Sequence, residues 1–255
     1  MVIWSFINFL ACIGVIVVNG LANALPLNGI GTGELSDLYP NLFVPAGVTF
    51  SIWGIIYILL IGFCIYSIRA SLSSKTDASF LKYVGPWFFL SCVANVLWIF
   101  AWHWQKVGLS LVVMLFLLFS LIIIYLNLNK RTEASLAELI FTRLPFSIYL
   151  GWITVALIAN VTALLVKTGW GGFGLSETFW TVTVIIVAVI ITLLVIHTRK
   201  DVGYSLVVIW ALLGIVLKRS ALGDAPAVTA AAVGGIVVIA LFLILVSVRK
   251  SVKRI

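Results

Sequence analysis

Long apolar runs alternate with short polar breaks along almost the whole chain. A transmembrane α-helix needs roughly 20 mostly apolar residues to cross the hydrocarbon layer. Most of the runs keep that length when their polar ends are trimmed, whereas the run 202–217 must borrow Asp201 and Lys218 at its edges. The pattern therefore predicts an all-α integral membrane protein with eight transmembrane helices. The runs are Met1–Gly33, Leu38–Arg69, Tyr83–Gln105, Val107–Asn129, Leu144–Val166, Thr178–Thr198, Val202–Leu217 and Ala225–Val248.

The basic residues are distributed unevenly between the two sides of such a bundle. With the N-terminus inside, only Lys106, Lys167, Lys218 and Arg219 of the 16 Lys and Arg residues fall in outer connections. Short loops rich in Lys and Arg stay on the cytoplasmic side of a membrane. We therefore predict an N-in, C-in topology. The basic residues of the inner connections are Arg69, Lys75, Lys82, Lys130, Arg131, Arg143, Arg199, Lys200, Arg249, Lys250, Lys253 and Arg254.

The composition excludes an ordinary soluble domain. Hydrophobic residues make up 63% of the chain and charged residues 9%, whereas about a quarter of the residues of a soluble globule are charged. The net charge of +8 lies at helix ends and in short loops, where anionic lipid headgroups attract it. We expect membrane lipid as a partner and no nucleic acid. A multi-pass protein of a bacterial or archaeal cell membrane fits these features.

No pattern in the sequence identifies catalytic chemistry or a metal site. Cys12, Cys64 and Cys92 are irregularly spaced within predicted helices, which favours buried free thiols over metal ligands. None of the predicted spans places a carboxylate at mid-membrane, where proton-coupled carriers keep one. A phosphate-binding glycine loop and a nucleophile elbow are also missing from the sequence. The catalytic residues, if the protein is an enzyme, stay unknown at this stage.

The first outer connection, Pro26–Val44, is unusually long. Connections of this length are commonly functional covers or disordered segments. This one carries Leu, Ile, Tyr and Phe among its glycines, together with Glu34 and Asp37. We expect it to fold back as a lid over an outward-facing cavity; the alternative is a solvated acidic loop without a binding role.

The amino-acid composition of the predicted spans changes after residue 166. The first five spans contain most of the tryptophans, whereas the last three are rich in Val, Ile, Leu and Ala. The final span has the density of small residues that lets helices approach closely in lipid. We predict a five-helix ligand-binding core at residues 1–166 and an appended three-helix transmembrane unit at residues 167–255.

Polar and aromatic side chains recur at helical spacing in the first, second, third and fifth spans, on one face of each. Under the predicted topology most of them lie in the outer half of the bilayer. A buried amide without a partner costs several kcal/mol in hydrocarbon, so the asparagines should face one another, water or a ligand. The stripes are Asn19 and Asn23; Thr49, Trp53 and Tyr57; Asn95, Trp98 and Trp102; and Tyr149, Trp152, Ala156 and Asn160.

Two readings of these stripes stay open. Flat aromatic walls with a few fixed polar groups are typical of a small-molecule pocket. Alternatively, asparagines join membrane helices to one another, and tryptophans near helix ends anchor them at the interface. His103, between Trp102 and Trp104, reads as an interfacial histidine more readily than as a metal or haem ligand.

The first five spans resemble the tryptophan-rich sensory protein family, also called the TspO/MBR or translocator protein family. The second span follows the order of the family's second helix, with Gly62 one position late, and the third and fifth spans match in turn. A valine, Val48, stands where many members have tryptophan, and the three further helices are not part of this resemblance. The matching residues are Pro45, Gly47, Phe50, Trp53 and Tyr57; Asn95, Trp98, Phe100 and Trp102; and Leu144, Pro145, Phe146, Tyr149, Trp152, Ala156 and Asn160.

The resemblance implies a five-helix bundle that binds porphyrin, haem, sterols or synthetic aromatic ligands beneath the first loop. Porphyrin or haem would then be present as a ligand, and from the residues we expect no metal site. The extra helices either replace the family's dimer contacts or form a second site, so a homodimer stays open. The residues carried over as ligand-binding are Asn23, Thr49, Trp53, Asn95, Trp98, Tyr149 and Trp152, to which the polar pattern adds Asn160.

We therefore expect a membrane protein that binds a hydrophobic aromatic, tetrapyrrole or sterol-like ligand in an outer-half pocket, as sensor or carrier. Two alternatives belong to other classes. The protein could be a small-molecule transporter or channel that uses the extra helices, or an enzyme that modifies a porphyrin or a lipid.

Overall fold

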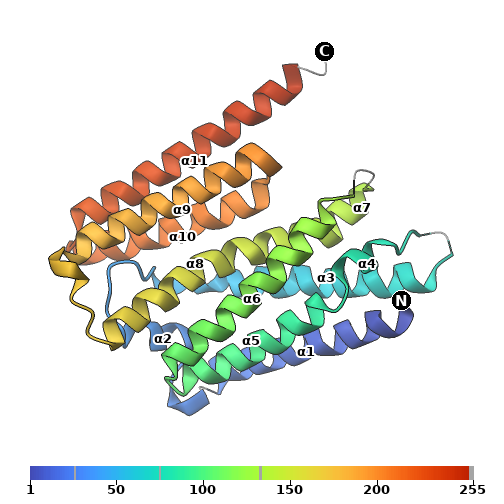
Figure 1. Cartoon of the computed structure of the whole chain (residues 1–255), viewed down its shortest axis with the longest axis horizontal. Coiled ribbons are helices and arrows are strands. Elements are labelled where there is room, and N and C mark those ends of the chain that lie inside the picture. Colours follow the sequence, from blue (N-terminus) through green and yellow to red (C-terminus); the bar gives the residue numbers. More distant parts are fainter. Residues whose placement is uncertain (26, 75, 132–133, 253–255) are drawn as a thin grey trace.

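The computed structural model describes residues 1–25, 27–74, 76–131 and 134–252, and every regular element in these ranges is helical (Figure 1). Pro26, Lys75, Lys253 and Arg254, which the sequence places in connections and at the C-terminus, lie outside the described residues. The long helices are α1 (Val2–Ala24), α3 (Ile52–Leu72), α5 (Trp87–His103), α6 (Val107–Leu128), α8 (Leu144–Lys167), α9 (Glu177–Arg199), α10 (Val202–Leu222) and α11 (Pro226–Val252). The short elements are η1 (Leu27–Gly29), α2 (Thr32–Asp37), η2 (Gly47–Ser51), α4 (Phe80–Val84), α7 (Leu136–Glu138), the π-helical turn η3 (Leu139–Arg143) and η4 (Gly172–Gly174).

The eight predicted apolar spans are confirmed as helices. Within the described ranges, seven helical segments are long and apolar enough to cross a membrane, and α5 is the shorter eighth. Helix α5 starts late because Gly85, with φ of 53°, and Pro86 separate it from α4. Helix α10 runs on to Leu222, five residues beyond the predicted end of its span, and thereby reaches 21 residues.

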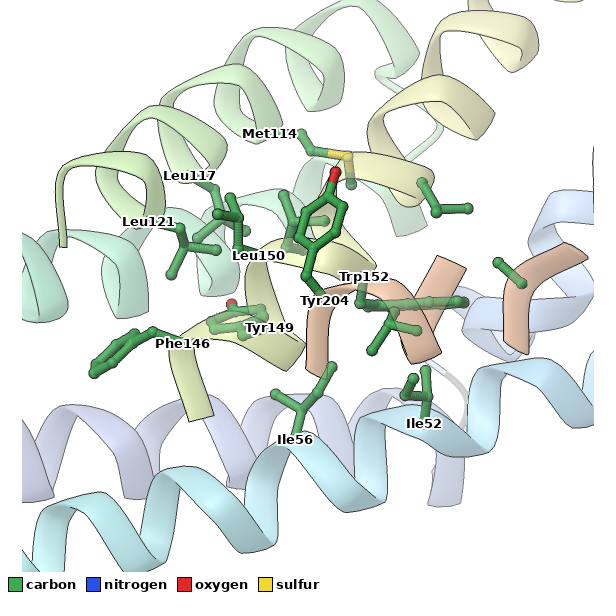
Figure 2. Packing of buried hydrophobic residues seen from close by; sticks show 14 of the residues in the cluster. Ile52, Ile56, Met114, Leu117, Leu121, Phe146, Tyr149, Leu150, Trp152 and Tyr204 are labelled. Carbon is green, nitrogen blue, oxygen red and sulfur yellow. The ribbon is translucent and has the colours of Figure 1, made fainter. Parts of the chain in front are cut away.

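Five of the helices form a closed ring. Around the ring, α1 contacts α3, α3 contacts α8, α8 contacts α6, α6 contacts α5, and α5 returns to α1. Figure 2 shows the interior beside α8, where Phe146, Tyr149 and Trp152 lie between aliphatic side chains of α3 and α6. These five helices are the ones that the sequence assigns to the core.

The last three helices pack together on the outside of α8. Helix α10 makes the contact with the ring, and α9 and α11 pack against α10 and each other (Figure 1). The approach is close at three glycines, Gly151, Gly203 and Gly214. A Cβ on Gly151 would lie 3.1 Å from the carbonyl of Tyr204, and one on Gly203 would lie 2.7 Å from Ser147 Oγ. At Gly214 the backbone carbonyl accepts a hydrogen bond from Ala46 N at 2.9 Å. The division of the chain at residue 166 stays a prediction.

Asp201, the residue directly before α10, connects the other end of α10 to the ring. The Asp201 carboxylate caps the helix by accepting from Tyr204 N at 3.0 Å. It also accepts hydrogen bonds from the hydroxyls of Tyr125 in α6 and Ser147 in α8. One carboxylate thus joins α10 to two helices of the ring.

Helix α1 begins and helix α11 ends at the same end of the bundle, as an even number of crossings requires (Figure 1). The same end carries α4 and α7, and the opposite end carries α2 and the connection from α8 to α9. The basic residues assign the end with the termini to the cytoplasm, and this orientation stays a prediction.

Candidate functional site

Four tryptophans from three helices meet inside the ring. Trp53 of α3 is central: its ring centroid lies 6.2 Å from that of Trp98 in α5 and 6.2 Å from that of Trp152 in α8. Trp98 stacks in turn on Trp102, one turn further along α5, at 6.3 Å. Tyr149 meets Trp53 edge to face at 6.0 Å. The helical spacing in the sequence brings these side chains together.

A small cavity lies against the tryptophan cluster, and we call it the tryptophan cavity. Its volume is about 40 Å³, whereas pockets for small organic ligands have roughly 300–1,000 Å³. Alanines that recur on one face of α8 leave the space open beside the larger rings. The cavity is lined by Thr32, Ser36, Val44, Pro45, Phe50, Trp53, Trp98, Trp102, Trp152, Val155, Ala156, Ala159, Asn160 and Ala163.

Two indole N–H groups beside the tryptophan cavity have no acceptor. Nε1 of Trp98 and Nε1 of Trp152 are both buried without a hydrogen-bond partner in the described part of the chain. A buried donor left unpaired costs about 1–3 kcal/mol, and such groups are rare in folded proteins. Both indoles line the cavity, so these two unpaired donors lie close to it.

The predicted asparagines satisfy one another more than they face the cavity. Asn19 Nδ2 donates to Asn95 Oδ1 at 2.7 Å, and Asn95 Nδ2 donates to the Tyr149 hydroxyl at 2.8 Å. This buried chain joins α1, α5 and α8, which is the interhelical role that the sequence left open. Asn160 does line the cavity, and its amide exchanges hydrogen bonds with Ser110 of α6 at 3.1 and 3.2 Å.

Two predicted site residues lie elsewhere. Asn23 is exposed on α1 and donates to the carbonyl of Asn19 in its own helix, because its position one turn beyond Asn19 carries it past the ring interior. Thr49 is buried but faces α10 near Gly214, since the short helix η2 turns it away from the tryptophans. Of the eight predicted residues, the structure brings Trp53, Trp98, Trp152 and Asn160 to the cavity wall, with Tyr149 and Asn95 adjoining the cluster.

Residues 27–44, which we call the lid, cover the cavity. Leu35, Tyr39 and Phe43 of the lid are buried, and Thr32, Ser36 and Val44 line the cavity directly. The alternative of a solvated acidic loop is wrong, because these apolar side chains give the segment a packed inner face. Burial raises the pKa of Tyr39 above its ordinary value.

His103 fastens the lid to α5, a role that the sequence did not reveal. Its Nδ1 lies 2.9 Å from the Leu27 carbonyl, which can only accept, so Nδ1 carries the proton. In the neutral ring Nε2 then accepts from the Thr32 hydroxyl at 2.9 Å. The His103 carbonyl accepts from Asn28 Nδ2 at 3.0 Å, and Trp102 Nε1 donates to the Thr32 carbonyl at 3.4 Å. The position of His103 between two tryptophans was the only signal in the sequence.

The lid is also tied to the three-helix unit. Glu177, in the first turn of α9, accepts from the backbone N–H of Leu42 at 2.7 Å. Lys218 of α10 forms an ion pair with Asp37 at 2.6 Å.

Among the described residues, no group of three or more His, Cys, Asp and Glu side chains is placed to hold a metal ion.

One of the comparisons with known proteins finds a match. A family model described as TSPO-like protein matches residues 5–245, which includes α9, α10 and most of α11 as well as nearly all of the ring. No curated protein and no solved structure matches the chain significantly. Because the family model covers nearly the whole chain, this membrane protein belongs to the TSPO-like protein family.

Proposed function

We propose that the protein binds a hydrophobic aromatic, tetrapyrrole or sterol-like ligand in the tryptophan cavity, as a sensor or a carrier. The observation that carries the proposal is the convergence of Trp53, Trp98, Trp102 and Trp152 on one covered cavity. Flat ring faces suit a flat guest, since aromatic rings prefer stacked or edge-to-face contacts. The two unpaired indole N–H groups suit a guest with carboxylate or carbonyl oxygens.

Binding requires the cavity to widen, because its present volume of about 40 Å³ is far below that of a tetrapyrrole site. We assign the movement to the lid, whose polar attachments are hydrogen bonds to α5 and α9 and one ion pair, and whose opening must also uncover the buried side chains of Leu35 and Phe43. A ligand that binds only the open form shifts the population towards that form. Its apparent affinity is lowered by the fraction of molecules that are closed.

The stacking test replaces two rings of the cluster. We expect Trp53→Leu with Trp98→Leu to raise the Kd for protoporphyrin IX by roughly 10- to 100-fold, because two aromatic contacts of about 0.5–1.5 kcal/mol each are lost. The absorption band of the porphyrin is the measurement, so that the loss of two fluorophores does not change the signal.

Trp104→Leu is the matched control, because Trp104 directly follows α5, is half exposed and does not line the cavity. It should bind protoporphyrin with the wild-type Kd. Equal affinity of the double variant and the wild type would remove the tryptophan cavity as the site.

The lid test uses Thr32→Val, which keeps the shape of the side chain and removes its hydroxyl. His103 Nε2 then loses its partner in the closed form, at a cost of about 1–3 kcal/mol. We expect the porphyrin to associate roughly 5-fold to 100-fold faster, in proportion to the larger open population. Stopped-flow mixing measures the rate.

Thr168→Val serves as the control for the lid test, since the Thr168 hydroxyl bonds the carbonyls of Leu164 and Leu165 at the end of its own helix. Its association rate should equal that of the wild type. An unchanged rate in Thr32→Val as well would show that guests reach the cavity by another route.

A further inference from the structure

A second and larger hollow lies outside the ring, between α8 and α9. This hollow, which we call the α8–α9 groove, has a volume of about 810 Å³, within the range of sites for drug-sized ligands. Its walls are aliphatic side chains such as Ile158, Val161 and Leu165 of α8 and Val184 of α9. A wall of this kind suits a hydrocarbon chain.

Three aromatic rings gather at the outer end of the α8–α9 groove. The centroid of Trp170 lies 5.3 Å from that of Phe173 and 5.1 Å from that of Trp180. Phe173 is 83% exposed, although it lines the groove. An open ring face of this kind can take a cation within about 6 Å of its centroid.

The backbone holds Phe173 in an unfavourable conformation. Its φ of 53° is in the left-handed region, which a bulky residue adopts rarely and at an energetic cost. Gly172 and Gly174 on either side also have positive φ, and Trp180 Nε1 donates to the Gly172 carbonyl at 2.9 Å. The loop is thus built to present this ring at the mouth of the groove, where strain is commonly kept for binding.

The charge at the α8–α9 groove has one sign. Glu177 is the charged residue among the described residues that line it, and no lysine or arginine is among them. The Glu177 carboxylate is exposed and uses Oε1 to accept from Leu42 N. A carboxylate beside open aromatic faces attracts an ammonium group and repels phosphate or sulfate.

We propose that the α8–α9 groove binds a single-chain amphiphile with a cationic ammonium head and no phosphate. The chain lies along the aliphatic walls of α8 and α9, and the head rests against Phe173 and near Glu177. The groove shares no lining residue with the tryptophan cavity, and Asn41, Phe43 and Glu177 connect it to the lid. Failure of one proposal therefore leaves the other standing.

The test labels the protein with three photoreactive probes in neutral maltoside micelles. The probes share one alkyl chain with a diazirine at its end and differ in the head: trimethylammonium, phosphocholine or sulfate. Peptide mapping after illumination locates the labelled residues. We expect the trimethylammonium probe to label the groove faces of α8 and α9 about tenfold more than the sulfate probe, with phosphocholine between them.

Two conservative variants test the head contacts. Glu177→Gln removes the charge and keeps a carbonyl oxygen for Leu42 N, and Phe173→Leu removes the ring face and keeps an apolar side chain. Each should reduce the preference for the trimethylammonium probe by about threefold or more. Trp104→Leu, at the exposed end of α5, should leave the preference unchanged.

Three outcomes would overturn the proposal. Labelling by phosphocholine or sulfate as strong as that by trimethylammonium would show that the head is not recognised as a cation. Labelling spread evenly over lipid-facing helices would show that the groove is not a site. An unchanged preference in both Glu177→Gln and Phe173→Leu would remove the assigned contacts.

Discussion

Replacing Arg131 with glutamine should lower the free energy of unfolding by about 3–5 kcal/mol, the loss expected when a buried charge is left without its partner. Arg131 Nε pairs with Glu138 Oε1 at 2.7 Å, and the Glu138 side chain is only 5% exposed. The guanidinium also reaches Asp77 at 3.0 Å and bonds the Ser79 hydroxyl. In Arg131→Gln the Glu138 carboxylate stays buried without that cation. Thermal unfolding in detergent at pH 7 measures the loss.

Lys130→Gln is the matched control, because it removes an equal charge from the neighbouring residue. Lys130 is exposed, and among the described residues its ammonium group donates only to the Asn127 side chain, so the expected change is within about 0.5 kcal/mol. Arg131→Gln combined with Glu138→Gln should recover part of the stability, since the unpaired charge is then gone. If Arg131→Gln and Lys130→Gln are equally stable, Arg131 does not hold the inner loops together.

The pH dependence of the wild type provides a second check on this cluster. Hydrogen bonds from Ser79, and then from Arg131, hold the pKa of Asp77 at about 2, below its ordinary value. A lowered carboxyl pKa contributes stability that is complete above about pH 4 and is lost as the pH falls towards 2. The contribution of Asp77 to the free energy of unfolding should therefore be constant between about pH 5 and 8 and decline only at acid pH.

Replacing Gly214 with alanine should detach the three-helix unit from η2, at a cost of roughly 2–4 kcal/mol. A Cβ at this position would lie 2.8 Å from Pro45 Cβ and 2.9 Å from Thr49 Cβ, and closer still to the Thr49 hydroxyl. The neighbouring atoms belong to a short helix and a proline, so relief requires the backbone to move. That movement breaks the bonds from Ala46 N to the Gly214 carbonyl and from Trp210 Nε1 to the Thr49 carbonyl.

Gly234→Ala in α11 is the control for this substitution, because a Cβ there would meet nothing within 4 Å. It should be neutral or slightly stabilising, since alanine favours a helix over glycine by up to about 1 kcal/mol. Thermal unfolding ranks the two variants, and limited proteolysis of the lid reports whether η2 has moved. Equal stability of the two would show that α10 docks without close contact at Gly214.

The helices were predictable from the sequence because the bilayer imposes one strong rule on them. A span must be apolar over its whole length, so breaks at charged and glycine-rich stretches mark the ends. The lid was predictable for a related reason, since buried residues such as Leu35 and Phe43 do not suit a solvated loop. The tryptophan cluster followed from spacing, because Trp53, Trp98 and Trp152 each lie on a polar and aromatic face.

The rest of the site depends on how helices are rotated against one another, which a single periodic pattern does not determine. Asn23 lies one helical turn after Asn19 but is exposed. Thr49 lies in the short helix η2 and faces α10. The role of His103 depends on a lid that folds back across sequence distance. The groove between α8 and α9 is lined at its outer end by a loop with positive φ angles at Gly172, Phe173 and Gly174, and the φ of Phe173 is a backbone feature that composition does not reveal.

The lid is fastened at one side to α5 and at the other to α9 and α10. Uncovering the tryptophans must therefore break hydrogen bonds in the ring and polar contacts with helices that contribute nothing to the cavity wall. A chain ending after α8 would lack the partners of Leu42 and Asp37, and its cover would open at a lower free energy. The last three helices thus raise the free energy needed to open the lid, although they do not line the cavity beneath it.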